Sequence, residues 1–285
     1  MHRQLSSDGT GGVSRTRVLA RVGTTLGSPG LLAGLVVALV ATVGVLSTAS
    51  SYVTLKQAGR DRADAWLEGR RDHLLGTFEQ AFGAADPLLD HLSAVVRGAP
   101  DEDRVLGMMP RLLALATRRL GVTWVSVSYP NGTFVGVVRG EDDEFEAQIT
   151  AVASLPEGGA SPAELASRGV ERRHGFDARG RMHETSRVPA SYDPRVRPFY
   201  RLALRERARV WTEPYTFLPD WHTGVTRAAP VFASDEPGAP LLAVLTVDFD
   251  TDELTRLLGT PLYARSRTLV VTAQGVVLAA HGVAL

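Results

Sequence analysis

A long uncharged segment near the N-terminus most constrains how this chain can fold. No charged side chain occurs between Gly23 and Leu55, and the stretch Leu31–Ala49 (LLAGLVVALVATVGVLSTA) is almost entirely apolar. A helix of nineteen residues rises about 28 Å, which is close to the hydrocarbon thickness of a bilayer. The segment therefore predicts a membrane-spanning helix over residues 30–50.

A cleaved signal peptide is the alternative for this segment, because small residues follow it at Ser47–Ser51. The segment is long for a signal peptide and begins about thirty residues into the chain, so we favour an uncleaved anchor. Residues 1–29 are rich in Gly, Ser, Thr and Arg with few large apolar side chains, which predicts a disordered tail.

Basic residues lie on both sides of the span in nearly equal numbers, so the charge bias alone does not set its orientation. Those before the span are Arg3, Arg15, Arg17 and Arg21, and those after it are Lys56, Arg60, Arg62, Arg70 and Arg71.

Composition excludes several function classes. The 285 residues contain 31 Lys and Arg against 31 Asp and Glu, and a chain of zero net charge is not typical of a nucleic-acid binder. There is no cysteine, which excludes disulfides, thiolate metal sites and thiol nucleophiles. No close pair of histidines, Walker loop or G-x-S-x-G elbow occurs. We expect no metal, no cofactor and no catalytic activity in this chain.

A heptad pattern follows the span and predicts a long stalk helix over residues 51–100. Seven apolar residues at alternating spacings of three and four fall on one helix face: Leu75, Phe78, Phe82, Ala85, Leu89, Leu92 and Val96. This face either joins two chains in a homodimer or packs on the domain of its own chain. Asp86-Pro87 predicts that the helix kinks or restarts there.

The remaining sequence predicts an α+β domain over residues 101–262. A helix is expected over residues 103–120, followed by strands Val122–Tyr129 and Thr133–Arg139 around a Pro-Asn-Gly turn. Residues 151–170 read as loop or short helix. Further strands are expected on both sides of Ala178–Gly180, and then in three segments: VWTEPYTFL, TGVTRAAPVFA and LLAVLTVDF. The predicted fold is an antiparallel sheet with helices on one face.

Two segments close the chain. TDELTRLLG predicts a helix capped by Thr251 or Asp252. Residues 263–285 predict one more hairpin, with strands Thr268–Thr272 and Val276–Ala280. Since a lone hairpin is marginal in water, we expect it to begin a second unit of a longer protein.

One corner of the sequence, SYDPRVRPFYRLAL from Ser191 to Leu204, combines features of an anion site. Asp193-Pro194 predicts a turn and Arg197-Pro198 a helix start, because proline suits the first helical position. The free amides of Phe199, Tyr200 and Arg201 would lie at the positive end of the helix dipole, and Arg197 would grip a carboxylate. Alternatively, the corner is a structural turn with its aromatic rings in the core and its arginines in water.

The corner and three later segments resemble the double Cache family of bacterial extracytoplasmic sensors. YDPRVRPFYRLAL, WTEPYTF, TGVTRAAPVF and LLAVLTVDFDTDEL occur in the order and spacing of that family, and the resemblance covers Val53 to the end. It implies a membrane-distal PAS-like unit within residues 101–262 and the beginning of a membrane-proximal unit at residues 263–285. It also implies a cytoplasmic N-terminus in the inner membrane, with the sensor domain outside.

The resemblance further implies a ligand site in the membrane-distal unit. Tyr192, Arg197, Phe199 and Tyr200 match the family's carboxylate-binding set, and Tyr215 and Asp248 match its ammonium-binding set. Phe199 replaces the usual tryptophan, and Phe217 replaces the first of two aspartates on the ammonium side. We therefore expect a small carboxylate-bearing ligand, with an amino acid less favoured. Trp221, His222 and Arg227 are further candidates to line the site.

The resulting hypothesis is the sensory region of a membrane receptor whose output is a histidine kinase, nucleotide cyclase or chemoreceptor module. A homodimer through the stalk would accompany that role. The alternative is a membrane-anchored enzyme or cell-envelope interaction protein, in which the corner is purely structural. Asp248, Asp250, Asp252 and Glu253 cluster near one predicted strand end, where metal sites can form, but capping and surface charge explain most of them.

Overall fold

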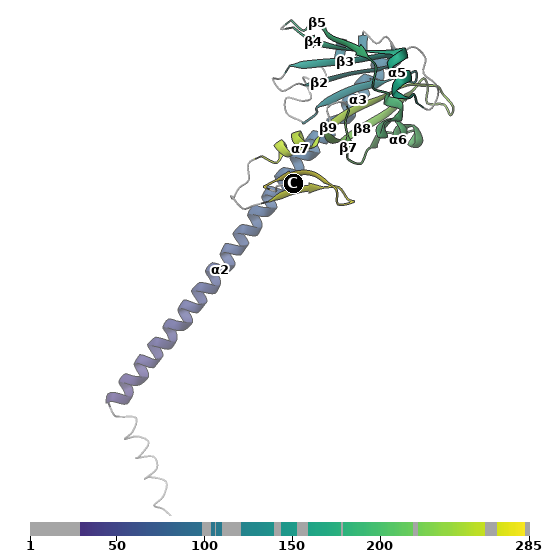
Figure 1. The fold of residues 1–285 in the computed structure, drawn as a ribbon. Coiled ribbons are helices and arrows are strands. Elements are labelled where there is room, and N and C mark those ends of the chain that lie inside the picture. The colour runs from purple at the N-terminus through teal and green to yellow at the C-terminus, as the bar shows by residue number, and fades with distance from the viewer. Residues whose placement is uncertain are drawn as a thin grey trace, which may run out of the picture. The chain divides into compact units, whose positions relative to one another are not determined.

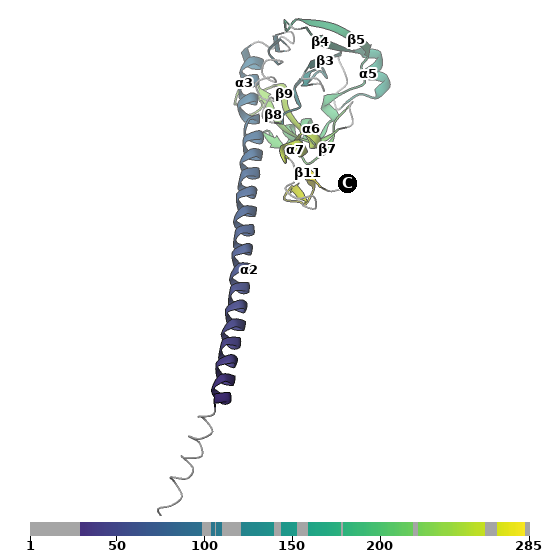
Figure 2. The same ribbon diagram turned by 90° about the vertical axis from the view of Figure 1, so that its left-hand side faces the viewer.

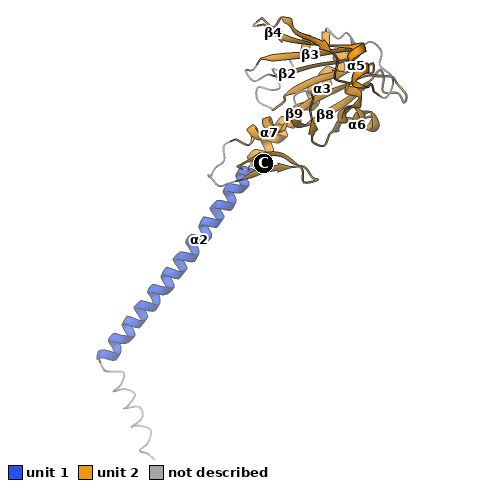
Figure 3. Ribbon diagram, in the orientation of Figure 1, with its two compact units in different colours: residues 1–71 blue, residues 72–285 orange. Residues whose placement is uncertain are grey.

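The computed structural model describes residues 29–98, 104–105, 107–109, 121–139, 144–152, 159–177, 179–218, 222–259 and 267–282. The chain divides into two compact units, residues 1–71 and residues 72–285 (Figure 3). Most of the helix predicted over residues 103–120 lies outside the described residues.

Helix α2 (Pro29–Gly83) runs without interruption through the predicted membrane span. Within the described part of the chain, it is the one helix that is long and apolar enough to cross a membrane. The large apolar side chains within the predicted span, such as Leu39 and Val45, are exposed. The hydroxyls of Thr42 and Thr48 donate to the carbonyls of Ala38 and Gly44 at 2.7 and 2.8 Å, so neither is left unpaired in an apolar medium.

The second unit is built on an antiparallel sheet (Figure 1). Nine strands among the described residues form it in the order β5-β4-β3-β2-β1-β9-β8-β6, with β7 beside β8. The strands are β1 (Trp124–Ser128), β2 (Phe134–Arg139), β3 (Phe145–Val152), β4 (Gly169–Phe176), β5 (Met182–Pro189), β6 (Val210–Trp211), β7 (Tyr215–Thr216), β8 (Thr223–Phe232) and β9 (Leu241–Asp250).

Helices cover both faces of the central strands, which differs from the predicted one-sided arrangement. The helices of this unit are α3 (Ala85–Gly98), α5 (Pro162–Arg168), α6 (Pro198–Glu206) and α7 (Thr251–Leu257), and a 3₁₀ turn η1 spans Pro194–Val196. Helix α3 lies along one face (Figure 2). On the opposite face, Phe199, Tyr200 and Ala203 of α6 pack against Ala228 and Val244. The α+β class itself is confirmed.

The predicted heptad face packs on the domain of its own chain. Leu89, Leu92 and Val96 of α3 are fully buried in one cluster with Val247 and Phe249 of β9. Phe82 also joins it, with its ring 5.1 Å from that of Phe249. At the start of the pattern, by contrast, Leu75 is 53% exposed. From Phe78 onward, this face therefore packs on the domain of its own chain, which is one of the two predicted alternatives.

The break between the helices lies slightly before the predicted Asp86-Pro87. Helix α2 ends at Gly83 and α3 begins at Ala85. The Asp86 carboxylate does not act as a cap, because it accepts two hydrogen bonds from the Arg227 guanidinium at 3.0 and 3.2 Å. Pro87 is tolerated because it falls in the first turn of α3, where its missing N–H has no helical partner.

Most local predictions for the domain agree with the structure. The hairpin around Pro-Asn-Gly forms as β1 and β2, and the turn after Phe176 joins β4 and β5. Strand β3 was not predicted, and α5 occupies part of residues 151–170. The cap of α7 was assigned wrongly: Asp250, not Thr251 or Asp252, accepts a hydrogen bond from the Glu253 amide at 2.7 Å.

The C-terminal hairpin forms as β10 (Thr268–Val271) and β11 (Val277–His281). It does not stand alone, because Leu278 and Ala279 of β11 join the core cluster that holds Leu254 and Leu258. The Ala280 amide also donates to the Thr255 hydroxyl at 3.3 Å. Packing of β11 against α7 and its C-cap residue Leu258 therefore stabilises a hairpin that would be marginal by itself.

Truncating Leu89 tests the packing of α3 on the sheet. Leu89→Ala leaves a cavity at a fully buried position and should lower the free energy of unfolding by about 2–5 kcal/mol. Leu204→Ala, on the exposed side of α6, is the control and should cost under about 1 kcal/mol. Urea unfolding of the chain in detergent, followed by tryptophan fluorescence, measures both. Equal effects would contradict the packing described here.

Candidate functional site

A buried ion pair fixes the corner that leads into α6. The Asp193 carboxylate, 1% exposed, accepts hydrogen bonds from the Arg195 guanidinium at 2.9 and 3.0 Å. It also accepts from the backbone amides of Arg195 at 2.9 Å and Ala160 at 3.2 Å. Burial opposes ionisation of Asp193, but these hydrogen bonds outweigh it and lower the pKa of the carboxyl. Tyr192 and Arg197 flank this clamp and are positioned by it.

Arg197 forms the N-cap of α6 and directs its side chain away from the helix. Its guanidinium donates to the Thr216 carbonyl at 2.5 Å and lies over the rings of Tyr192 and Tyr215, at 6.0 and 5.5 Å from their centroids. Its Nε is buried and has no hydrogen-bond partner among the described residues. The Arg201 amide is not free as expected, because it donates to the Arg197 carbonyl at 3.2 Å.

The sheet supplies the floor of the site through the alternation of its strands. Along β9, Val247 and Phe249 point into the core, so Asp248 points to the other face. Trp124 of β1 and Thr226 of β8 are the register partners of Asp248 on its two sides. The three side chains therefore form a row on the face that α6 partly covers.

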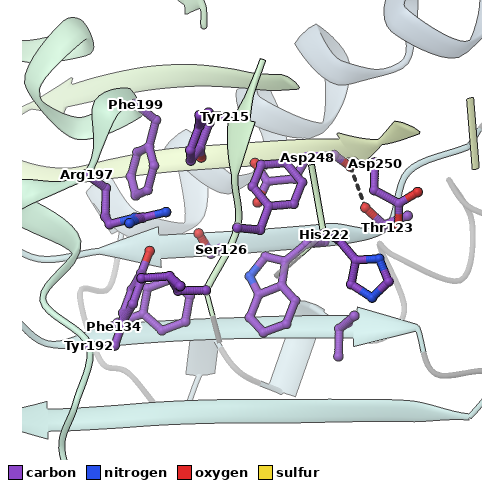
Figure 4. A pocket seen from close by; sticks show the side chains of 14 residues that line it. Thr123, Ser126, Phe134, Tyr192, Arg197, Phe199, Tyr215, His222, Asp248 and Asp250 are labelled. Atoms are coloured by element: carbon purple, nitrogen blue, oxygen red, sulfur yellow. Dashed lines mark hydrogen bonds between the residues drawn. The ribbon is translucent and has the colours of Figure 1, made fainter. Parts of the chain in front are cut away.

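These elements enclose a partly open cavity of about 60 Å³, enough for roughly four to six water molecules. Arg197 reaches in from one side, while Asp248 lies across the cavity and His222 and Asp250 lie toward its far end (Figure 4). The lining residues are Thr123, Trp124, Ser126, Phe134, Val138, Tyr192, Arg197, Phe199, Tyr215, Phe217, Leu218, His222, Asp248 and Asp250.

Asp248 is the buried acid of this cavity. Its side-chain Oδ1 has no hydrogen-bond partner among the described residues. Burial raises the pKa of Asp248 to about 7, although a hydrogen bond with Thr226 and the positive charge of Arg197 partly oppose that rise. The Thr226 hydroxyl also shares a hydrogen bond of 2.8 Å with the Tyr215 hydroxyl.

Aromatic rings form the walls, and two glycines make room for them. The Tyr192 ring meets the Phe134 ring edge-on at 4.9 Å, and the Tyr215 ring meets the Phe217 ring edge-on at 5.1 Å. A methyl group at Gly136 would lie 2.6 Å from Trp124 Nε1, and one at Gly224 would lie 2.6 Å from the Phe217 ring. Side chains at either glycine would displace a wall of the cavity.

Five of the six predicted ligand residues line the cavity, namely Tyr192, Arg197, Phe199, Tyr215 and Asp248. Tyr200 does not, because it packs beneath α6 against Ala228 and Val244. Of the further candidates, His222 lines the cavity and Trp221 lies outside the described residues. Arg227 points to the opposite face, where it pairs with Asp86.

Sequence reasoning missed the floor and wall residues Trp124, Ser126 and Phe134. The predicted hairpin contained a usable signal, because Trp124 and Ser126 alternate with the buried Val125 and Val127. Within the described residues, no group of three or more His, Cys, Asp or Glu side chains is placed to hold a metal ion.

Comparison with known proteins gives structural matches alone. No family model and no curated protein matches this sequence. The ligand-binding domain of the amino acid chemoreceptor PctB of Pseudomonas aeruginosa, in complex with L-Gln, is 15% identical with a TM-score of 0.46. This chain spans 66% of its length, and the match covers 75% of this chain.

Two further solved structures are of the same kind. The ligand-binding domain of the Pseudomonas aeruginosa chemoreceptor PctC, in complex with GABA, is 18% identical with a TM-score of 0.46, and the match covers 76% of both chains. That of the Campylobacter jejuni chemoreceptor Tlp3, in complex with 4-methylisoleucine, is 13% identical with a TM-score of 0.42, covering 76% of this chain and 70% of that one. All three are ligand-binding domains of bacterial chemoreceptors.

Removing Asp193 tests the clamp that positions the corner. Asp193→Ala leaves the largely buried Arg195 guanidinium without its partner and should destabilise the domain by about 3–5 kcal/mol. Because the pKa of Asp193 is lowered on folding, its contribution is present above the ordinary value of 3.8 and is lost as pH falls below it. Urea unfolding of both proteins between pH 3 and 7 measures the difference.

The matched control for Asp193→Ala is Glu206→Ala, which breaks the exposed pair of Glu206 with Arg205 and should cost under about 1 kcal/mol. A difference between wild type and Asp193→Ala that grows as the pH falls would contradict the role given to the carboxylate.

Proposed function

We propose that this chain is the extracytoplasmic ligand-sensing region of a membrane-bound signal-transduction receptor and that it binds a small carboxylate-bearing molecule. The observation that carries the proposal is the Arg197 guanidinium at the cavity, with its buried Nε unpaired. A guanidinium offers a carboxylate charge-assisted hydrogen bonds, and Arg197 keeps at least its Nε–H uncommitted although another of its N–H groups donates to Thr216. A purely structural corner would instead turn its arginine to water or satisfy it within the protein.

The size and lining of the cavity support a small ligand. Aromatic rings surround the charged groups, so the site resembles ligand pockets that are mostly apolar with a few placed polar groups. The PctB, PctC and Tlp3 domains were solved in complex with L-Gln, GABA and 4-methylisoleucine. For this chain we propose the broader carboxylate class, because Phe217 occupies a position where the predicted family carries an aspartate.

The apolar part of α2 supports an anchor in the bacterial inner membrane, with residues 1–29 in the cytoplasm and the sensor domain outside. A histidine kinase, nucleotide cyclase or chemoreceptor module elsewhere in the receptor would supply the output, and this chain itself would not be an enzyme. A homodimer would form through exposed residues of α2 such as Leu55 and Leu67, because the heptad face from Phe78 onward is packed on its own sheet.

Replacing Arg197 tests the ligand site. Arg197→Ala should weaken binding of every small carboxylate that binds the wild type by roughly tenfold or more, because charge-assisted hydrogen bonds are lost. Calorimetry of the chain in lipid nanodiscs, with acetate, propionate, lactate and succinate, measures the affinities. Arg201→Ala, an exposed arginine on the same helix, is the control and should bind as the wild type does. Unchanged affinity in Arg197→Ala would overturn the proposal.

Cysteine labelling tests the membrane topology, because the natural chain has no cysteine. Ser234→Cys, in an exposed turn, should react with a membrane-impermeant maleimide in spheroplasts. Ser14→Cys, in the predicted cytoplasmic tail, should react only after the membrane is permeabilised. The reverse pattern would contradict an extracytoplasmic sensor.

A further inference from the structure

Two residues on different sides of the same cavity each carry a buried polar atom that lacks a hydrogen-bond partner. Arg197 Nε is a donor and Asp248 Oδ1 is an acceptor, and neither has a partner among the described residues. Both residues line the cavity, from different sides (Figure 4). Because an unpaired buried polar group costs free energy, the two atoms define what a ligand must bring: an acceptor for Arg197 and a donor for Asp248.

The other side-chain oxygens near Asp248 already have partners. Tyr215 shares a hydrogen bond with Thr226 at 2.8 Å, and Ser126 shares one with Thr246 at 2.6 Å. The Asp250 carboxylate caps α7 by accepting from the Glu253 amide at 2.7 Å. Among the lining residues that the structure describes, Asp248 thus offers one uncommitted carboxylate oxygen.

Phe217 adds an apolar surface near this acceptor. Its ring lies over Gly224, where a methyl group would come within 2.6 Å of it, and it packs edge-on against Tyr215. Gly224 is the register partner of Asp250, and Thr226, two residues farther along β8, is the register partner of Asp248, so the Phe217 ring lies toward the Asp250 end of this row. An ammonium group placed at Asp248 would therefore find one free carboxylate oxygen and an aromatic wall for its three N–H donors.

We propose that the ligand is a short hydroxycarboxylate, with its carboxylate on Arg197 and its hydroxyl donating to Asp248 Oδ1. This inference rests on the proposed function, which it narrows from carboxylates in general. A hydroxyl brings a single donor and matches a single acceptor, whereas an ammonium would leave donors unpaired in a partly buried site. A cavity with room for roughly four to six water molecules suits a short acid.

The charges predict how binding depends on pH. A hydroxycarboxylate places a second negative charge near Asp248, so binding favours the neutral acid, whose pKa in the free site is already raised to about 7 by burial. Affinity should then be full below pH 7 and fall by up to about tenfold per pH unit above it, since one proton is taken up on binding. An α-amino acid would pair its ammonium with ionised Asp248, so its affinity should instead fall as pH drops below 7.

The other groups that face Asp248 do not produce this dependence. Arg197 is the positive charge that acts on Asp248, and burial raises the pKa of Tyr192 and Tyr215, which keeps both neutral. His222 and Asp250 lie farther along the same cavity. Burial also raises the pKa of Asp250. Because the inference assigns the pH dependence to Asp248 alone, the variants His222→Gln and Asp250→Asn should each retain the pH slope.

Three acids of one carbon skeleton test the inference: lactate, propionate and L-alanine. Calorimetry of the chain in nanodiscs between pH 6 and 9 should show lactate binding about tenfold more tightly than alanine or propionate at pH 6.5. Lactate affinity should fall as the pH rises above 7. Asp248→Asn, which cannot ionise, should lose this dependence of lactate affinity on pH.

Substitutions at Phe217 provide a matched pair. Phe217→Asp adds a second acceptor and should shift the preference from lactate toward alanine, while Phe217→Leu keeps an apolar wall and should leave the preference unchanged. Tighter binding of alanine than of lactate by the wild type would overturn the inference, as would no binding of the three probes at 10 mM. In either case the proposed function is judged separately, by whether other carboxylates bind through Arg197.

Discussion

The two faces of one sheet impose the constraint on which the rest of this domain depends. Every strand that passes beneath the cavity must bury apolar side chains against α3 at alternate positions and present the intervening ones to the ligand side. On β9, Val247 and Phe249 are buried in the core, and Asp248, which lies between them, faces the cavity. The cost of burying this carboxylate is partly offset by its hydrogen bond with Thr226 of β8 and by the positive charge of Arg197.

Local signals made several elements predictable. Period-two runs around Pro-Asn-Gly specified the first hairpin, and Asp193-Pro194 and Arg197-Pro198 specified the corner, because each proline fixes its own backbone angle. Strand β3 escaped prediction because it begins beside an acidic run and carries polar residues such as Glu146 and Gln148 among its apolar ones. The cap of α7 was misplaced by one residue, since Asp250, Thr251 and Asp252 are all acceptable caps by type.

The cavity itself required the tertiary structure. Trp124 and Asp248 become neighbours through strand pairing across more than a hundred residues, which no local pattern contains. Tyr200 illustrates the opposite case: its motif suggested a ligand contact, but its position on α6 turns the ring toward Ala228 and Val244. A motif fixes which residues are present, whereas the helix phase decides which of them reach the cavity.

Adjacent residues of β8 link the two faces. The Thr226 hydroxyl contacts Tyr215 and Asp248 at the cavity, and the next residue, Arg227, grips Asp86 in the first turn of α3. One rigid peptide unit thus joins the cavity to the junction of α2 and α3. In the proposed receptor, a displacement of β8 on ligand binding would therefore move an anchor point of that junction without a separate relay of side chains through the core.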